Sequence, residues 1–555
     1  PPAAYAVTLP RQGTSPFEAE LKFRQFSLYL QDQMNLHERF RMNAGLRFEL
    51  PHYPALHDNY NVPYARLVFN QQAFRTDQVP ETMLAVSPRL GFNWDVLGEQ
   101  KMVVRGGTGY FVGRLPYVWL VSTVLNSNCG QIQYSFNNPS QASAGIPAFR
   151  TTVAQQVEQL NIDRSVQTAP QYPTILDTKL RMNAAWKTSL ALDVKLPYDI
   201  DLTIEGLYSR DYNPAVITNV NAVESGNTLV LSPYDQRTLY TGDNAGNQAY
   251  YITNGDNKPY YYAVTAILSK KFDFGLNLSA AYTFARARSF GDGMGDQVTS
   301  AYSVNRYSVG AVNGQETGYS TFVSPHRLIV SAAYRKEYLR NFATTVGLVY
   351  EGRNMGLANG VAMTRYSYTF STNLIGDGGP ANLIRIPATR EELDNWEFAE
   401  QVYNKANKAN EPYTVDGNLY TAQQQRDDFW AYIQQDSYLK NHKGQYATRG
   451  GAIMPWHHQM DFKLIQDFFI HTGKYKNTLQ MGVDIENLPN LLNKKWGLYK
   501  MVNNPALLAY NSKAGAAHGY TFQKNGKERL TGTYSDYADF ASTYRVMFTV
   551  RYIFN

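Results

Sequence analysis

The 555-residue chain contains a single cysteine, Cys129, and no long hydrophobic run. One thiol excludes a disulfide framework within the chain. No stretch approaches the roughly 18 consecutive apolar residues of a membrane-spanning helix, and the mean hydropathy is −0.41. Because every backbone polar group needs a partner inside a bilayer, a chain without such helices can span one only as a closed β-barrel.

Charge of either sign is also sparse. The chain has 52 Lys and Arg against 46 Asp and Glu, a net charge of +6, with no dense basic run. A weak, scattered excess is typical of solvated faces, so we expect no nucleic-acid binding. Residues 1–5 have neither the basic nor the apolar segment of a signal peptide. Since a bacterial barrel that spans a membrane must be exported, we expect that an upstream signal has been removed.

Aromatic residues are abundant, with 42 Tyr, 27 Phe and 7 Trp, and at the C-terminus their placement is regular. In residues 544–554 two chemistries alternate, and successive side chains of a strand point to opposite faces. One face consists of Tyr544, Val546, Phe548, Val550, Tyr552 and Phe554. The other consists of Arg545, Met547, Thr549, Arg551 and Ile553. An apolar face with aromatics at both ends is typical of a lipid-facing strand between two aromatic girdles.

The same alternation recurs along the chain. It is found in 40–50, 186–196, 200–208, 274–284, 328–334 and 460–470. Charged residues fall on the second face of these segments, among them Lys187, Asp193, Lys195, Asp201, Glu205, Arg327, Arg335, Asp461 and Lys463. A charged face on so many strands requires water beside it.

Short polar turns join the predicted strands in pairs, and long segments separate the pairs. The pairs are 25–34 with 40–50, 84–95 with 101–112, 184–196 with 200–212, 260–272 with 274–287, 327–336 with 342–353, and 457–470 with 476–486. A last strand, 543–554, brings the count to thirteen. Short periplasmic turns and long outer loops are typical of outer-membrane barrels, which predicts a periplasmic C-terminus. Since single-chain bacterial barrels have even strand numbers, we expect the later part of a larger barrel.

Several motifs in the right order resemble one family. The segment 27–33 (SLYLQDQ), followed by 44–48 (AGLRF), resembles a hairpin of TonB-dependent outer-membrane receptors. The segments 87–92 (SPRLGF) and 105–111 (RGGTGYF) resemble the signature of the Oar-like branch, large receptors with an N-terminal carboxypeptidase-regulatory-like domain. The match continues at 324–327, 454–456, 461–463 and 484–493. The resemblance covers about residues 20–555.

This resemblance implies a 22-stranded barrel with a plug domain inside it and a TonB box ahead of the plug. We therefore expect residues 1–24 to be a lead-in segment or extracellular loop, and 25–555 to be the C-terminal part of the receptor barrel. The plug and the regulatory-like domain are not present in this chain. The implied function is active import across the outer membrane of a Gram-negative bacterium, driven by TonB–ExbB–ExbD through the absent plug segment.

The long outer loops supply candidate substrate contacts. These are Tyr117 and Trp119 in 113–183, and Tyr366, Tyr368, Trp430 and Trp456 in or beside 354–456. Aromatic rings stack on sugars and lie along peptides, so an oligosaccharide or a peptide is the expected ligand, although the same rings could simply pack the loops together. A surface-exposed lipoprotein and lipid or lipopolysaccharide are further expected partners. The alternative functions are a docking or assembly platform for a lipoprotein or secreted protein, and a passive pore.

We expect neither catalysis nor a cofactor. Thr389 and Glu392 form the pattern of a helix cap and predict a short outer helix over 390–407, and a second is predicted over 422–439. Such helices are interpreted as lids. His457 and His458 are adjacent in a predicted strand and point to opposite faces, so they indicate anchoring or hydrogen bonding to the interior and not a metal site.

Overall fold

The fold is described from a computed structural model of the chain. The described residues are 5–11, 22–54, 56, 65–127, 129–136, 150–160, 172–241, 248–292, 297–304, 306–404, 409–412, 414–415, 418–473, 475–512, 518–526 and 528–554. Among them, no helix is both long and apolar enough to cross a membrane.

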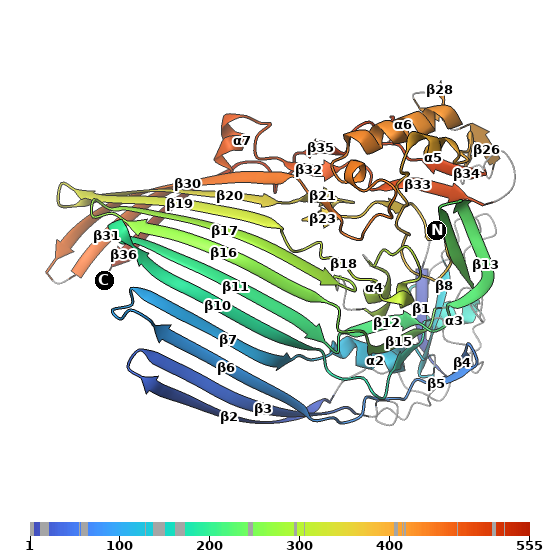
Figure 1. Cartoon of the computed structure of the whole chain (residues 1–555), viewed down its shortest axis with the longest axis horizontal. Helices are drawn as coiled ribbons and strands as arrows, with labels where there is room; N and C mark the ends of the chain where they lie inside the picture. Colours follow the sequence, from blue (N-terminus) through green and yellow to red (C-terminus); the bar gives the residue numbers. More distant parts are fainter. Residues whose placement is uncertain are drawn as a thin grey trace.

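One large antiparallel sheet dominates the described part of the chain (Figure 1). Thirteen of its strands are hydrogen-bonded in sequence order, and the short β18 (Gly318–Tyr319) pairs with β17 beside this path. The thirteen are β2 (Arg24–His37), β3 (Phe40–His52), β6 (Ala85–Asp95), β7 (Met102–Val112), β10 (Ala184–Leu196), β11 (Ile200–Tyr212), β16 (Tyr260–Lys271), β17 (Leu276–Ser289), β19 (His326–Tyr338), β20 (Phe342–Asn354), β30 (Trp456–Thr472), β31 (Tyr475–Glu486) and β36 (Arg545–Phe554). The thirteen strands predicted from the alternation are confirmed.

The pairing register aligns the two faces across the whole sheet. Leu464 lies opposite Val483, which lies opposite Phe548, so one face presents a continuous apolar row. One residue earlier on β30, Lys463 lies opposite Asp484 and forms an ion pair with it at 2.9 Å. Because a one-residue slip would exchange the faces of a strand, this register fixes an apolar face and a polar face.

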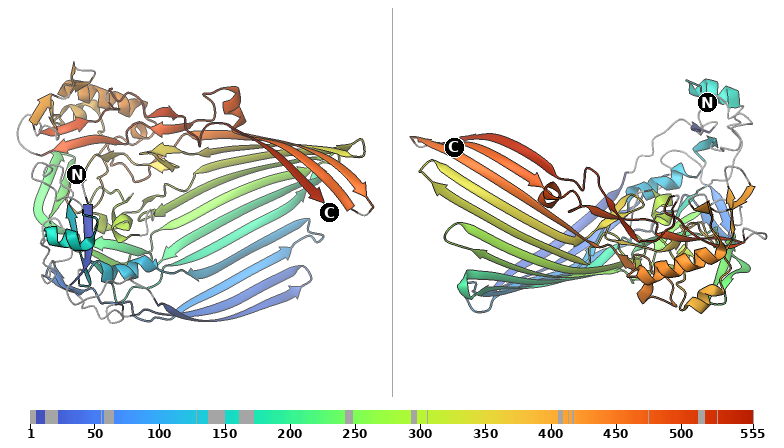
Figure 2. Two further views of the ribbon diagram at one scale, coloured as in Figure 1. Left: turned by 180° about the vertical axis from the view of Figure 1, so that it is seen from behind. Right: turned by 90° about the horizontal axis from the view of Figure 1, so that it is seen from above.

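The connections differ in length at the two ends of the sheet. Tight turns join successive strands at one end, and the long loops gather at the other (Figures 1 and 2). At the β16–β17 turn, Gly275 has φ +98° and its N–H donates to the carbonyl of Phe272 at 3.0 Å. Its own carbonyl accepts from the N–H of Arg335 at 3.1 Å, which ties this hairpin to β19.

The sheet is curved, and it does not close on itself (Figure 2). Within the described residues, β2 pairs only with β3 and β36 pairs only with β31. The outer edges of these two strands therefore present unpaired backbone groups.

Most of the remaining elements lie in the long loops; the exceptions are the tight turn at 197–199 between β10 and β11 and the strand at 5–10 ahead of β2. The helices are α2 (Tyr117–Leu125), α3 (Val153–Leu160), α4 (Val298–Ser303), α5 (Arg390–Asp394), α6 (Ala422–Gln435) and α7 (Leu488–Leu492), with 3-10 turns η2 (Pro197–Asp199), η3 (Val312–Gly314) and η4 (Leu439–Asn441). The short strands are β1 (Tyr5–Pro10), β4 (Arg66–Phe69), β5 (Gln72–Arg75), β8 (Gln131–Phe136), β9 (Thr174–Leu176), β12 (Ala215–Asn219), β13 (Val223–Ser232), β14 (Asp235–Thr241), β15 (Tyr250–Asn254), β21 (Gly356–Ala358), β22 (Val361–Met363), β23 (Arg365–Tyr366), β24 (Thr369–Phe370), β25 (Gln401–Asn404), β26 (Ala409–Pro412), β27 (Thr414–Val415), β28 (Asn418–Leu419), β29 (Ala452–Ile453), β32 (Tyr499–Val502), β33 (Ala506–Asn511), β34 (Gly519–Phe522) and β35 (Tyr534–Tyr537).

The largest hydrophobic core lies in these loops and not in the sheet. We call it the loop core; it includes Tyr368, Trp396, Phe429 and Tyr520, and the Trp396 and Tyr520 rings stack at 4.7 Å. Each fully buried aromatic side chain such as Phe429 contributes about 2 kcal/mol to stability. The loops are therefore a packed body of their own.

The predicted helix over 390–407 is wrong for residues 395–404, and its last three residues, 405–407, lie outside the described part of the chain. Thr389 does cap α5, accepting from the N–H of Glu392 at 3.2 Å, but the helix ends at Asp394. The chain then turns at Asn395 and leaves the helix, and Trp396 and Phe398 both enter the loop core beside Tyr520. The second predicted helix is confirmed as α6, although it ends at Gln435.

Candidate functional site

The polar face of the sheet carries ion pairs between neighbouring strands. Arg105 of β7 lies 2.8 Å from Asp193 of β10 and 3.9 Å from Glu205 of β11. On the other half of the sheet, Arg335 of β19 reaches past β20 to Asp467 of β30 at 2.8 Å. Charged groups held in this way line a surface that faces water.

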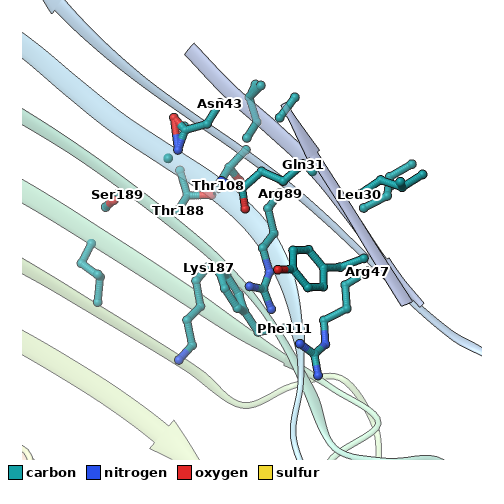
Figure 3. Close-up of a pocket in the computed structure, with 18 residues that line it drawn as sticks. Leu30, Gln31, Asn43, Arg47, Arg89, Thr108, Phe111, Lys187, Thr188 and Ser189 are labelled. Atoms are coloured by element: carbon teal, nitrogen blue, oxygen red, sulfur yellow. Dashed lines mark hydrogen bonds between the residues drawn. The ribbon is translucent and has the colours of Figure 1, made fainter. Parts of the chain in front are cut away.

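A strip without side chains runs along this face where β3, β6 and β7 meet. It is formed by Gly45, Gly91, Gly107 and Gly109. Gly45, Gly91 and Gly107 of this strip line a hollow of about 380 Å³ (Figure 3). Arg89 and Lys187 extend above it on either side of Phe111, with the Arg89 guanidinium 4.7 Å and the Lys187 ammonium 5.8 Å from the ring centre.

A second hollow of about 640 Å³ lies where the loops meet the ends of β7, β10 and β11. Phe111, Lys187 and Asp211 border it from the sheet, and Trp119 and Arg306 border it from the loops. Arg306 is buried and donates to the carbonyl oxygen of Ile217 at 2.8 Å. Burial lowers the pKa of Arg306 to about 10.

The two hollows share Phe111 and Lys187 and therefore form one track from the loops along the polar face. Among the described residues, neither Lys187 nor Arg89 forms an ion pair with a carboxylate, in contrast to Arg105 on the neighbouring strand. An aromatic ring between two unpaired cations can hold a ligand that combines an apolar or planar part with an anionic or hydroxyl-bearing part.

Two of the predicted substrate contacts lie near this track. Tyr117 is the first residue of α2, is partly exposed, and its ring lies 5.3 Å from that of Phe23. Trp119 lies two residues further along α2, packs partly against a second loop cluster around Leu120 and Tyr250, and borders the larger hollow. The structure thus brings Trp119 together with Phe111 and Lys187.

Three other predicted contacts lie in or against the loop core. Tyr366 and Tyr368 have exposed fractions of 3% and 0%, and their hydroxyl groups are 3.1 Å apart. Burial raises the pKa of both well above the ordinary value for tyrosine. Trp430 of α6 is partly buried against the same core, with the Lys443 ammonium 5.3 Å from its ring.

Trp456 lies elsewhere, on the apolar face at the start of β30. It belongs to a row of rings, each 5.3 to 6.2 Å from the next, which we call the aromatic belt: Tyr260, Tyr262, Phe284, His326, Trp456, His458 and Tyr350. His458 and Tyr350 are also hydrogen-bonded at 2.7 Å, whereas His457 lies on the polar face and stacks on Tyr499. A belt of this kind marks the level of the lipid headgroups.

The sequence does not predict the track. Lys187 lies on the predicted polar face of 186–196, and Phe111 belongs to the motif at 105–111. Nothing in the local sequence predicts that they lie beside Trp119. The signal that links them is the register between β7 and β10, in which Lys187 pairs with Gly109, two residues before Phe111.

A curved antiparallel sheet with an apolar, aromatic-bordered face and a charged face is the wall of a membrane-spanning β-barrel. The chain belongs to the family described as the outer membrane beta barrel domain, which matches residues 5–506. The protein is therefore located in an outer membrane. A search of curated proteins gave no match.

Solved structures that align with the chain include siderophore receptors. A variant of the ferric enterobactin receptor PfeA from Pseudomonas aeruginosa aligns with a TM-score of 0.40 and 9% identity, over 96% of this chain and 45% of that one. The siderophore receptor PirA from Acinetobacter baumannii aligns with a TM-score of 0.36 and 7% identity, over 86% of this chain and 43% of that one. The chain spans less than half the length of these two receptors.

Proposed function

We propose that the chain forms the C-terminal part of a TonB-dependent importer of the outer membrane. The observation that carries this proposal is the track of Phe111 and Lys187, which runs from the loops onto the polar face of the barrel wall. A wall with a ligand-sized hollow at its mouth is suited to capture followed by passage, and not to sieving alone.

The unpaired edges of β2 and β36 support a larger barrel. Each unsatisfied backbone group costs several kcal/mol in lipid, so further strands must cover both edges in the membrane. We propose that 25–555 supplies the later strands of a 22-stranded barrel and that 1–24 leads into it, with plug and earlier strands supplied by sequence outside this chain. TonB–ExbB–ExbD would act through that plug.

The motifs at 87–92 and 105–111 support assignment to the Oar-like branch. For the ligand we propose an oligosaccharide or a peptide, with Trp119 as the principal loop contact and Tyr117 and Trp430 as secondary ones. Tyr366 and Tyr368 would act by holding the loop core in shape, and Trp456 by anchoring the wall at the lipid surface.

The test uses cells that produce the full-length protein and two fluorescent probes, labelled malto-oligosaccharides and a labelled tryptic digest of casein. Uptake of one probe that stops when a protonophore collapses the inner-membrane gradient supports the importer. We expect Trp119→Ala and Lys187→Ala each to lower uptake at least tenfold, since each removes about 1.4 kcal/mol or more of contact. Lys101→Ala, in an exposed turn, is the matched control.

Two outcomes support the alternatives. Entry of either probe that persists without the gradient indicates a passive pore. Surface binding without entry, together with co-purification of a surface lipoprotein, indicates a docking platform.

A further inference from the structure

Strand β17 continues past the aromatic belt on the apolar side of the sheet. Phe284 is a belt residue, and Arg286 and Arg288 follow on the same face at the next two outward positions. They lie directly opposite Tyr262 and Tyr260 in β16, and Arg288 is also opposite Tyr319 in β18. These two arginines are therefore level with the belt residues Tyr262 and Tyr260, at the loop-side end of the belt, where lipid headgroups are expected.

Three guanidinium groups surround one ring at this place. The distances from the centre of the Tyr319 ring are 4.8 Å for Arg286, 5.1 Å for Arg288 and 4.5 Å for Arg365, which reaches in from the loop strand β23. Burial and the nearby Arg286 charge lower the pKa of Arg365 to about 10, against the opposite effect of Tyr319. Three like charges around one ring repel one another unless an anion lies between them.

No carboxylate within the described residues forms an ion pair with these three arginines. Arg286 donates to the Tyr319 hydroxyl, Arg288 to the carbonyl of Thr317 at 2.8 Å, and Arg365 to that of Gly450 at 3.2 Å. The Nε atoms of Arg286 and Arg288 are buried and have no hydrogen-bond partner there. Two arginines of the polar face differ in this respect, since Arg327 pairs with Glu351 and Arg335 with Asp467.

There is room for a ligand beside the cluster. Arg288 borders a hollow of about 420 Å³, together with Lys258, Arg449 and Glu316. Glu316 is the acidic residue of that lining, and the lining residue Arg449 is buried, which lowers its pKa to about 10. The cationic groups at this hollow thus outnumber the carboxylates.

We propose that Arg286, Arg288 and Arg365 form a binding site for the phosphate group of a lipid headgroup in the outer leaflet. Guanidinium groups bind phosphate with paired N–H donors, and a phosphate would take the unpartnered Nε–H groups and offset the repulsion among the three charges. The belt beneath the cluster would contact the acyl region of the same lipid. This inference uses only the outer-membrane location and is independent of what the protein transports.

The test measures lipid retention by the full-length protein in detergent, using native mass spectrometry. The probes are bisphosphorylated lipid A and the same lipid without its phosphates. The native protein is expected to prefer the phosphorylated lipid at least tenfold, and the double variant Arg286→Gln/Arg288→Gln to lose that preference, because two charge-assisted contacts disappear. Arg288→Lys, which keeps the charge but not the planar fork, should give an intermediate preference.

Arg340→Gln makes the same charge change in the turn at the opposite end of the sheet and should retain the full preference. An unchanged thermal unfolding temperature shows that the double variant is folded. Equal preference in the double variant and the native protein would overturn the proposal. Displacement of the lipid by an equal concentration of inorganic phosphate would show that the site binds free phosphate, and would overturn the proposal that its ligand is a lipid headgroup.

Discussion

Tyr368 donates a hydrogen bond of 2.6 Å to the carboxylate of Asp436, across 68 residues of sequence and inside the loop core. Asp436 has an exposed fraction of 2% and no cationic partner among the described residues. Its oxygens also accept from the hydroxyl of Thr533 at 2.9 Å and from the N–H groups of Tyr438 and Leu439. One buried carboxylate thus connects α6, η4 and two distant loops.

Replacement of Asp436 by alanine is therefore expected to destabilise the loop core by about 3 kcal/mol or more, because several buried donors lose their acceptor. Limited proteolysis of the protein in detergent measures this as faster cleavage within 420–540. Asp256→Asn, at an exposed surface pair with Lys258, should leave the cleavage rate unchanged. An unaltered rate in the alanine variant would show that Asp436 is not a structural centre.

The loop core should also lose stability at alkaline pH. Burial raises the pKa of Tyr534 from 10.0 to about 12. Below pH 10 both the folded and the unfolded state hold this proton; between pH 10 and 12 only the folded state does, so stability falls as the pH rises. The thermal unfolding temperature, measured across this window, should decline.

Tyr534→Phe removes that titration, and the decline should become shallower. Tyr198→Phe, in an exposed turn, serves as the control and should follow the native protein. If both variants decline alike, the titration of Tyr534 does not contribute.

The β16–β17 turn gives a test of hairpin geometry. Gly275 has a positive φ, and a Cβ there would overlap the carbonyl oxygen of Arg335. Gly473, in the β30–β31 turn, also has a positive φ, but no atom lies within 4 Å of its Cβ position. Gly473→Ala should cost about 1 kcal/mol for the backbone conformation alone, and Gly275→Ala about 3 kcal/mol because the clash is added. Urea-induced unfolding in detergent compares the two variants; equal costs would contradict the close approach of Arg335.

Trp456 should be at the lipid surface, since its exposed fraction is 39% and it stacks between His326 and His458 in the belt. Lipids brominated near the carbonyl end of the acyl chain should quench part of the tryptophan fluorescence, and Trp456→Phe should remove part of that quenching. Trp119→Phe should not, because Trp119 borders the hollow inside the mouth. The opposite pattern would place Trp456 away from the lipid.

The wall of the barrel was predictable because the alternation of apolar and polar residues within each strand shows which side chains lie on each face. The predicted pair 184–196 and 200–212 coincides with β10 and β11, and the last strand differs from β36 by two residues at its start. Alternation with a period of two needs no knowledge of distant residues, so composition and turn length were sufficient.

The loops were not predictable to the same degree, since long-range packing decides their structure. Trp396 follows a correctly predicted cap, yet its stacking on Tyr520, far along the chain, ends the helix. Tyr366 and Tyr368 were predicted as ligand contacts because they are aromatic residues of a long outer loop. Both are buried, and their burial depends on how the loops fold together and not on the local sequence. The track of Phe111 and Lys187 likewise depends on strand pairing.

The loop core draws none of its buried residues from the thirteen strands of the wall. Mutations in the loop core can therefore change the outer surface without changing the backbone hydrogen bonds between the strands of the wall. Over evolutionary time the loops can diversify under pressure from nutrients, phages or antibodies while the wall changes slowly. Exchange of all the segments that build the loop core together, 355–455 along with the segments that contain Leu231, Val502 and Tyr520, is the route that such a division favours.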